Sequence, residues 1–181
     1  MTREGQMNVY IVKIDYFDAD KWPVLAAPYG GPNPDTSRTN IEEVARKLGK
    51  DGVAILVGSS SQRVPNRLKH KLLGAVSCHM ALYDTKEVVD HALYTSHHFT
   101  RTDGHFRMPY CIPYASIVTC QKPLQHARNA CGEELVDPDN RRQWLIKLSQ
   151  PQADIALEVV ARYAEGRTDR PRPDKGFIKD L

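Results

Sequence analysis

The sequence contains no hydrophobic run that approaches the roughly 20 apolar residues needed to cross a membrane. Its first residues show no cleavable signal pattern, and its four cysteines include no Cys-x-x-Cys pair. P-loop, Gly-x-Gly-x-x-Gly and Gly-x-Ser-x-Gly motifs are also missing. These absences predict a cytoplasmic protein with reduced, mostly buried cysteines, and they exclude the common signatures of nucleotide-dependent enzymes and serine hydrolases.

Composition is that of an ordinary globular protein. The chain has 181 residues, of which 41% are hydrophobic and 26% are charged, and its formal net charge is +3. This length is sufficient for one domain with a substantial core. Because so small a charge neither requires nor excludes nucleic acid as a partner, the positions of the cations matter more than their number.

Hydrophobic periodicity predicts an α+β fold. Patterns typical of strands occur at 7–15, 53–57, 72–80 and 114–120, while Thr85 to Tyr94 is ambiguous between strand and helix. A Thr39–Glu42 capping box predicts a helix that ends near Leu48, and Pro151 opens another. Short helices are expected at 124–131 and 141–148. We therefore predict a small, mostly antiparallel β-barrel with flanking helices over residues 1–166, followed by a basic, flexible tail at 167–181.

Two sets of residues could bind a ligand. Aromatic rings and hydroxyl groups suit a pocket for a flat, hydrogen-bonding heterocycle, and the residues predicted to form it are Trp22, Tyr29, Ser37, Ser59, Ser60 and Tyr110. Closely spaced cations suit contacts to phosphate or to the edge of a base, and this set is Arg38, Arg63, Arg67, Lys69 and Arg107. Two alternatives remain open: Trp22 anchors its proline-rich loop to the core, and the cations form only a solvated face.

Histidines offer an alternative function from another class. His97, His98 and His105, with Asp103, invite a metal-dependent nuclease or hydrolase. Adjacent histidines on an extended chain point to opposite faces, so His97 and His98 do not easily share one ion. A third hypothesis is a protein-interaction module that uses the apolar residues around Trp144. We assign no catalytic residue, metal ligand or cofactor.

Two short motifs carry a resemblance to a known family. Leu72-Leu73-Gly74-Ala75-Val76 is followed by a segment that runs from Gly104 to Pro113, and then by Lys122-Pro123-Leu124. Over about Val53 to Leu135, this arrangement resembles the PUA-like superfamily, most closely EVE-type domains, with ASCH domains as neighbours. The family's arginine-tryptophan-proline is Arg107-Met108-Pro109 in this chain.

The resemblance implies a small β-barrel whose pocket reads a nucleobase, often a modified one such as a methylated or hydroxymethylated cytosine. It implies a reader of DNA or RNA without a cofactor, acting alone or with a nuclease partner in trans. Under this hypothesis the aromatic and hydroxyl residues form the base pocket, and the cations contact the nucleic-acid backbone or the edges of the bases.

Overall fold

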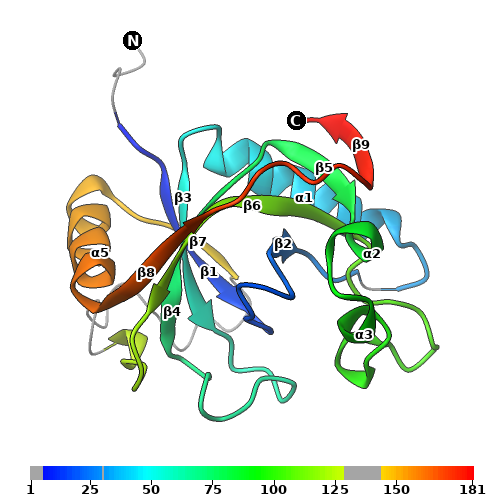
Figure 1. Cartoon of the computed structure of the whole chain (residues 1–181), viewed down its shortest axis with the longest axis horizontal. Helices are drawn as coiled ribbons and strands as arrows, with labels where there is room; N and C mark the ends of the chain where they lie inside the picture. Colours follow the sequence, from blue (N-terminus) through cyan, green and yellow to red (C-terminus); the bar gives the residue numbers. More distant parts are fainter. Residues whose placement is uncertain (1–5, 30, 129–143) are drawn as a thin grey trace. The chain divides into compact units, whose positions relative to one another are not determined.

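The computed structural model describes residues 6–29, 31–128 and 144–181, and in them the chain has an α+β fold with a mostly antiparallel mixed sheet. The elements, in chain order, are β1 (Val9–Ile14), β2 (Val24–Ala26), α1 (Asp35–Leu48), β3 (Val53–Gly58), β4 (Leu72–Cys78), β5 (Ala81–Asp84), α2 (Thr85–Val88), α3 (His91–Tyr94), the 3-10 helix His97–Phe99, β6 (Tyr110–Cys120), β7 (Leu145–Lys147), α5 (Gln150–Tyr163), β8 (Ala164–Asp169) and β9 (Phe177–Asp180) (Figure 1).

Strand pairing confirms the predicted fold class. β1 and β3 pair in parallel, whereas β1–β7, β2–β6, β3–β4, β5–β6, β5–β9 and β6–β8 are antiparallel. Within the described residues these pairings run from β7 to β9 without joining the two ends, so the sheet is not closed into a barrel.

The chain divides into two compact units. The first unit comprises Met1–Phe17, Asp51–Ser77 and Ser116–Asp169, and the second comprises Asp18–Lys50, Cys78–Ala115 and Arg170–Leu181. Each unit is assembled from three separate segments, which explains why no composition shift along the sequence marks a boundary.

In the first unit, the strands pair in the order β7-β1-β3-β4-β6, with β8 also paired to β6. Alternate strand residues such as Ile11 and Ile55 are fully buried, and they belong to the same core cluster as Ala153, Ala156 and Val160 of α5. The strand residues recur every second position and the helix residues every three or four, as expected for a sheet face covered by an amphipathic helix. Both predicted patterns are therefore confirmed.

In the second unit, the antiparallel order is β2-β6-β5-β9. Helix α1 begins at Asp35 after Pro34, five residues earlier than predicted. The expected capping box is wrong, because Thr39 lies inside the helix and donates its hydroxyl to the carbonyl oxygen of Asp35. Ser and Thr side chains bond to the preceding helical turn as readily as they cap, so the motif alone is ambiguous.

Three other expectations also differ from the structure. β6 begins at Tyr110, four residues before the predicted strand at 114–120, and it includes Pro113, which is paired with Val24. Leu145–Lys147 forms β7 rather than part of a helix, and Thr85 to Tyr94 forms two short helices. The expected helix at 124–131 is described only as far as residue 128.

The segment predicted to be a flexible tail contains the end of β8 and all of β9. β9 pairs with β5, and Lys179 Nζ lies 2.8 Å from Glu42 Oε1. The Tyr83 hydroxyl donates to the Pro173 carbonyl oxygen at 3.0 Å. Main-chain pairing thus orders a segment whose proline-rich, charged composition gives no strand signal.

Three cysteines match their predicted state. Cys78, Cys111 and Cys120 are free and buried, and burial raises the pKa of the Cys78 and Cys111 thiols to about 12. Such thiols are poor nucleophiles and metal ligands. The fourth, Cys131, lies outside the described residues.

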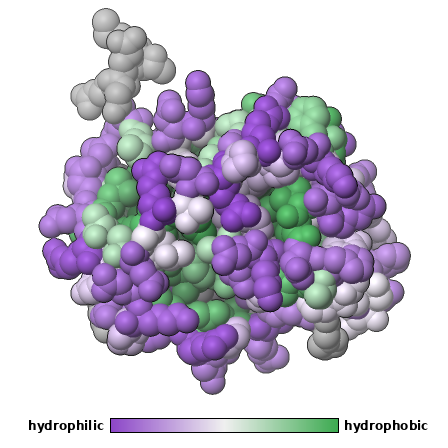
Figure 2. All heavy atoms as spheres, in the orientation of Figure 1, coloured by the Kyte–Doolittle hydropathy of each residue, from purple (hydrophilic) through white to green (hydrophobic). Residues whose placement is uncertain are grey.

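No helix in the described part of the chain is long and apolar enough to cross a membrane. On the face drawn in Figure 2, hydrophilic side chains predominate and apolar ones are visible between them. Large exposed apolar residues include Met7, which precedes β1, Ile155 in α5 and Phe177 in β9.

Candidate functional site

Five basic side chains in the first unit form what we call the basic cluster. Lys13 lies in β1, Lys69 and His70 precede β4, and His126 and Arg128 follow β6. All five residues are partly buried.

Main-chain hydrogen bonds hold the segments of the basic cluster together. The His70 nitrogen donates to the carbonyl oxygen of Gly58 at 2.8 Å, and the Ala127 nitrogen donates to that of His70 at 2.8 Å. A Cβ atom at Gly58 would collide with the main-chain carbonyl oxygen of Leu68. Glycine at the end of β3 therefore allows the loop that carries Lys69 to fold back onto the strand.

His70 has an unusual backbone conformation, with φ at 57°. This left-handed region is uncommon for a residue with a side chain, and such strain is concentrated at functional sites. The conformation places the His70 ring beside that of His126, with 5.9 Å between ring centroids and 26° between planes. The two imidazoles thus come from segments more than 50 residues apart in the sequence.

Among the described residues, the charges that act on His70 are all positive. Burial lowers the pKa of His70, and the positive charges of His126, Lys13, Arg128 and Lys69 lower it further. Within the described residues, the buried Nε of Arg128 has no hydrogen-bond partner. A bound anion would relieve both the mutual repulsion and the unsatisfied donor.

Three predicted cations lie on the same loop of the first unit. Arg63 and Arg67 are exposed and Lys69 is partly buried. No ion pair joins Arg67 or Lys69 to a carboxylate in the parts of the chain that the structure describes. Cations without a carboxylate partner remain available to an anionic ligand.

The serines of this loop are engaged locally. Ser59 Oγ donates to Asp15 Oδ1 at 2.6 Å and accepts from the Ser61 nitrogen at 3.2 Å. Ser60 is exposed. Ser59 therefore joins the ends of the parallel strands β1 and β3, which is a structural role that leaves little capacity for a ligand.

The remaining predicted pocket residues belong to the second unit. Trp22 is only 4% exposed and stacks on Phe99, with 4.1 Å between centroids and 9° between planes. Ser37 is fully buried and donates to the Ala27 carbonyl oxygen at 2.6 Å. In this conformation neither side chain offers a surface to a base. The open alternative, that Trp22 anchors its loop, is the one this packing favours.

Tyr29 and Tyr110 are partly buried, and the Arg101 guanidinium carbon lies 4.2 Å from the Tyr29 ring centroid. One face of Tyr29 is thus already covered by a cation. Arg38 pairs with Glu42 at 3.0 Å, and Arg107 donates to the carbonyl oxygen of His98 at 3.3 Å. The predicted residues therefore divide between the two units, and only those of the first unit accompany the basic cluster.

Two residues of the alternative enzyme hypothesis, Asp103 and His98, have structural partners. Asp103 pairs with Arg101 at 3.2 Å and accepts from the main-chain nitrogen of His105 at 3.1 Å. The His98 ring packs edge-on against Phe99, with 4.7 Å between centroids. In the described segments, no three His, Cys, Asp or Glu side chains are grouped so that they could hold a metal ion.

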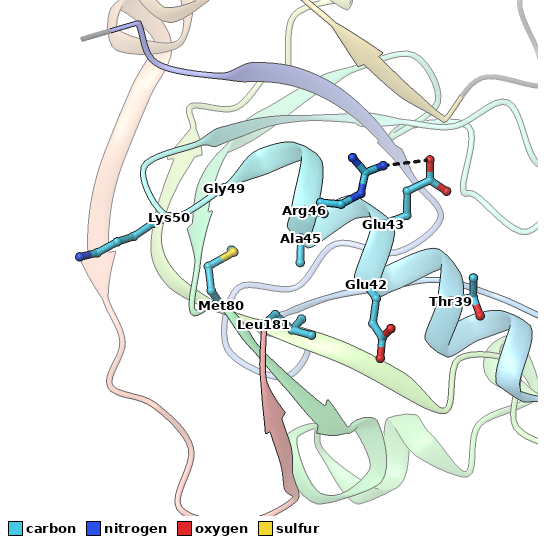
Figure 3. Close-up of a pocket in the computed structure, with 9 residues that line it drawn as sticks. All are labelled: Thr39, Glu42, Glu43, Ala45, Arg46, Gly49, Lys50, Met80 and Leu181. Atoms are coloured by element: carbon cyan, nitrogen blue, oxygen red, sulfur yellow. Dashed lines mark ion pairs between the residues drawn. The ribbon is translucent and has the colours of Figure 1, made fainter. Parts of the chain in front are cut away.

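A separate groove of about 630 Å³ lies in the second unit, along α1. Figure 3 shows Glu42 and Glu43 on the helix, with Met80 and Leu181 beside it. Lys179 and Arg38 pair with Glu42, and the hydrogen bond from Lys179 lowers the pKa of that carboxyl. Lys47 pairs with Glu43 at 2.7 Å. Both carboxylates of this groove are therefore already paired with basic side chains.

Sequence reasoning missed three members of the basic cluster: Lys13, His126 and Arg128. Each lies in a different sequence context from Lys69, and no motif connects them. Only the pairing of β1 with β3 and the return of the chain after β6 bring them together. Trp144, proposed as an interaction residue, is partly buried, and its carbonyl oxygen accepts from the Lys13 nitrogen at 2.8 Å.

Comparisons with protein-family models, with curated proteins and with solved structures gave no match for this chain.

Proposed function

We propose that this protein binds nucleic acid and that the basic cluster, with Arg63 and Arg67, contacts the phosphate backbone. The observation that carries the proposal is the convergence of four basic groups around His70, at a place where no carboxylate neutralises Arg67 or Lys69 in the described residues. Phosphate contacts of this kind supply most of the affinity that is independent of sequence.

The finer parts of the proposal rest on the family resemblance. They are a PUA-like barrel, a pocket that reads a modified base of DNA or RNA, a nuclease partner in trans and a cytoplasmic location. Tyr110 and Tyr29 are the predicted pocket residues whose rings remain partly exposed. Base reading through Trp22 would require its loop to move away from Phe99.

The test of backbone binding is the salt dependence of affinity. Fluorescence anisotropy with labelled single- and double-stranded oligonucleotides, at several salt concentrations, should give a linear fall of log K with log salt. Lys69→Ala and Arg67→Ala should each weaken binding to all sequences. For each phosphate that the variant no longer neutralises, the slope should become shallower by roughly 0.9 on duplex DNA, or about 0.7 on single strands.

Lys175→Ala is the matched control, because it removes one exposed positive charge from the second unit. Its slope should equal that of the wild type. If Lys69→Ala and Arg67→Ala behave like this control, the basic cluster is a solvated face and the proposal is wrong. Repeating the titration with cytosine, 5-methylcytosine and 5-hydroxymethylcytosine in one sequence tests base reading separately, since phosphate contacts are the same in all three.

A further inference from the structure

The first unit contains a cavity of about 520 Å³ between its sheet and α5. The cavity reaches Val53 at the start of β3 and Ser77 near the end of β4. The basic cluster lies at the opposite ends of these strands, beside Gly58 and Leu72. The cavity is thus a different site from the proposed phosphate contact.

The cavity is partly open to solvent, because Ala161 and Gly166 in its lining are exposed. Farther along the strands, large side chains such as Ile11 and Ile55 belong to the core that α5 covers. At the cavity, the smaller side chains of Ala75, Ala161 and Ala164 take part in the lining, so the helix and the sheet leave a hollow that a ligand can fill.

One polar feature lies in this mainly apolar lining. Ser77 Oγ and Ser116 Oγ, on neighbouring strands, are 2.7 Å apart and partly buried. Their mutual hydrogen bond uses one hydroxyl hydrogen, so the pair retains one donor and several acceptor sites for a ligand.

The charged residues of the lining do not favour a charged ligand. Glu165 and Arg167 are exposed and opposite in sign, and Arg167 Nε already lies 3.2 Å from Asp169 Oδ1. The other lining residues are uncharged, so an ion bound among them would have no partner of opposite charge. The chemistry of the lining therefore selects an uncharged molecule.

We propose that this cavity binds a small uncharged molecule that has an apolar body and one hydroxyl or carbonyl group. The apolar body packs between α5 and the sheet, and the polar group bonds to the Ser77–Ser116 pair. The volume is within the range of about 300–1,000 Å³ that is usual for small-molecule sites. This site does not depend on nucleic-acid binding.

The test uses 1-octanol as the probe and octanoate as its charged counterpart, titrated into the full chain by isothermal titration calorimetry. We expect saturable binding of one octanol and at least tenfold weaker binding of octanoate. Ala161→Leu, which fills the cavity from α5, should weaken octanol binding at least tenfold. Ser116→Ala should weaken it about three- to tenfold, the usual effect of removing one hydrogen bond.

Ala92→Leu makes the same side-chain change at an exposed position of α3 in the second unit, and it should bind octanol as the wild type does. Absence of saturable octanol binding overturns the proposal, as does unchanged binding in a folded Ala161→Leu variant. If Ala161→Leu does not fold, the Ser77→Ala and Ser116→Ala variants decide: unchanged octanol affinity in both overturns the proposal. Equal affinity for octanoate overturns the assignment of an uncharged ligand.

Discussion

Replacement of Trp22 by alanine distinguishes a core side chain from a wall of a ligand pocket. The ring is 4% exposed, and an indole buries about 150–250 Å². At about 25 cal/mol per Å², burial of that area is worth about 4–6 kcal/mol, as an upper value. The stack on Phe99 at 4.1 Å adds about 0.5–1.5 kcal/mol. Because the surroundings relax partly, we expect Trp22→Ala to lower the free energy of unfolding by about 3–5 kcal/mol.

Urea denaturation followed by circular dichroism measures this loss. Trp22→Phe keeps an aromatic ring against Phe99 and should cost less than Trp22→Ala. Tyr29→Ala, on the other side of β2, is the comparison, because this ring is only partly buried and one face is occupied by Arg101. Its cost should be near 1 kcal/mol, typical of a single substitution.

The affinity of each variant for oligonucleotides should also be measured, under conditions in which that variant is folded. If Trp22 is a core side chain, the folded Trp22→Phe variant should discriminate between modified and unmodified bases as the wild type does. A loss below about 1 kcal/mol for Trp22→Ala, together with a selective loss of about 1–3 kcal/mol for the preferred base, would refute the packing argument and identify a stacking surface.

Three further predictions concern the first unit. In urea denaturation, Gly74→Ala should lower the free energy of unfolding by about 1–3 kcal/mol or more, because the added Cβ would meet the Val118 main-chain carbonyl oxygen. Gly166→Ala, which places its Cβ in open space, should change that free energy little. Ser149→Ala removes the capping box of α5 and should lower stability by about 1 kcal/mol, measured by thermal unfolding. Because the folded-state pKa of His70 is lowered, its contribution to stability should be lost as pH falls through about 6.5, the ordinary histidine pKa, towards the folded value. His70→Asn, which tolerates positive φ, should show a smaller acid-induced loss, and an equal loss in the variant would contradict the assignment.

The elements predicted correctly are those whose signal is local. Val53–Gly58 is a short apolar run and folds as a buried strand. α5 begins with Pro151 in its first turn, and its apolar residues recur every three or four positions. In these segments, local propensity and burial favour the same structure, so the sequence alone was sufficient.

Where local and long-range preferences differ, sequence-based prediction failed. The residues of β7 and β9 have no strong strand pattern, and they form strands because β1 and β5 present main-chain groups to them. Similarly, Pro113 lies within β6, where it is opposite Val24 of the short strand β2. Main-chain hydrogen bonding depends on which strand edge is nearby, and a single sequence does not contain that information.

By itself, the sequence determined the α+β class, the buried cysteines Cys78, Cys111 and Cys120, and the cations of the loop before β4. Tertiary structure decided which of the predicted residues face a possible ligand. It buried Trp22 against Phe99 and brought His126 beside His70, more than 50 residues away. The physical reason is that burial and charge proximity are properties of chain segments that meet in space, whereas residue type and periodicity are properties of one segment alone.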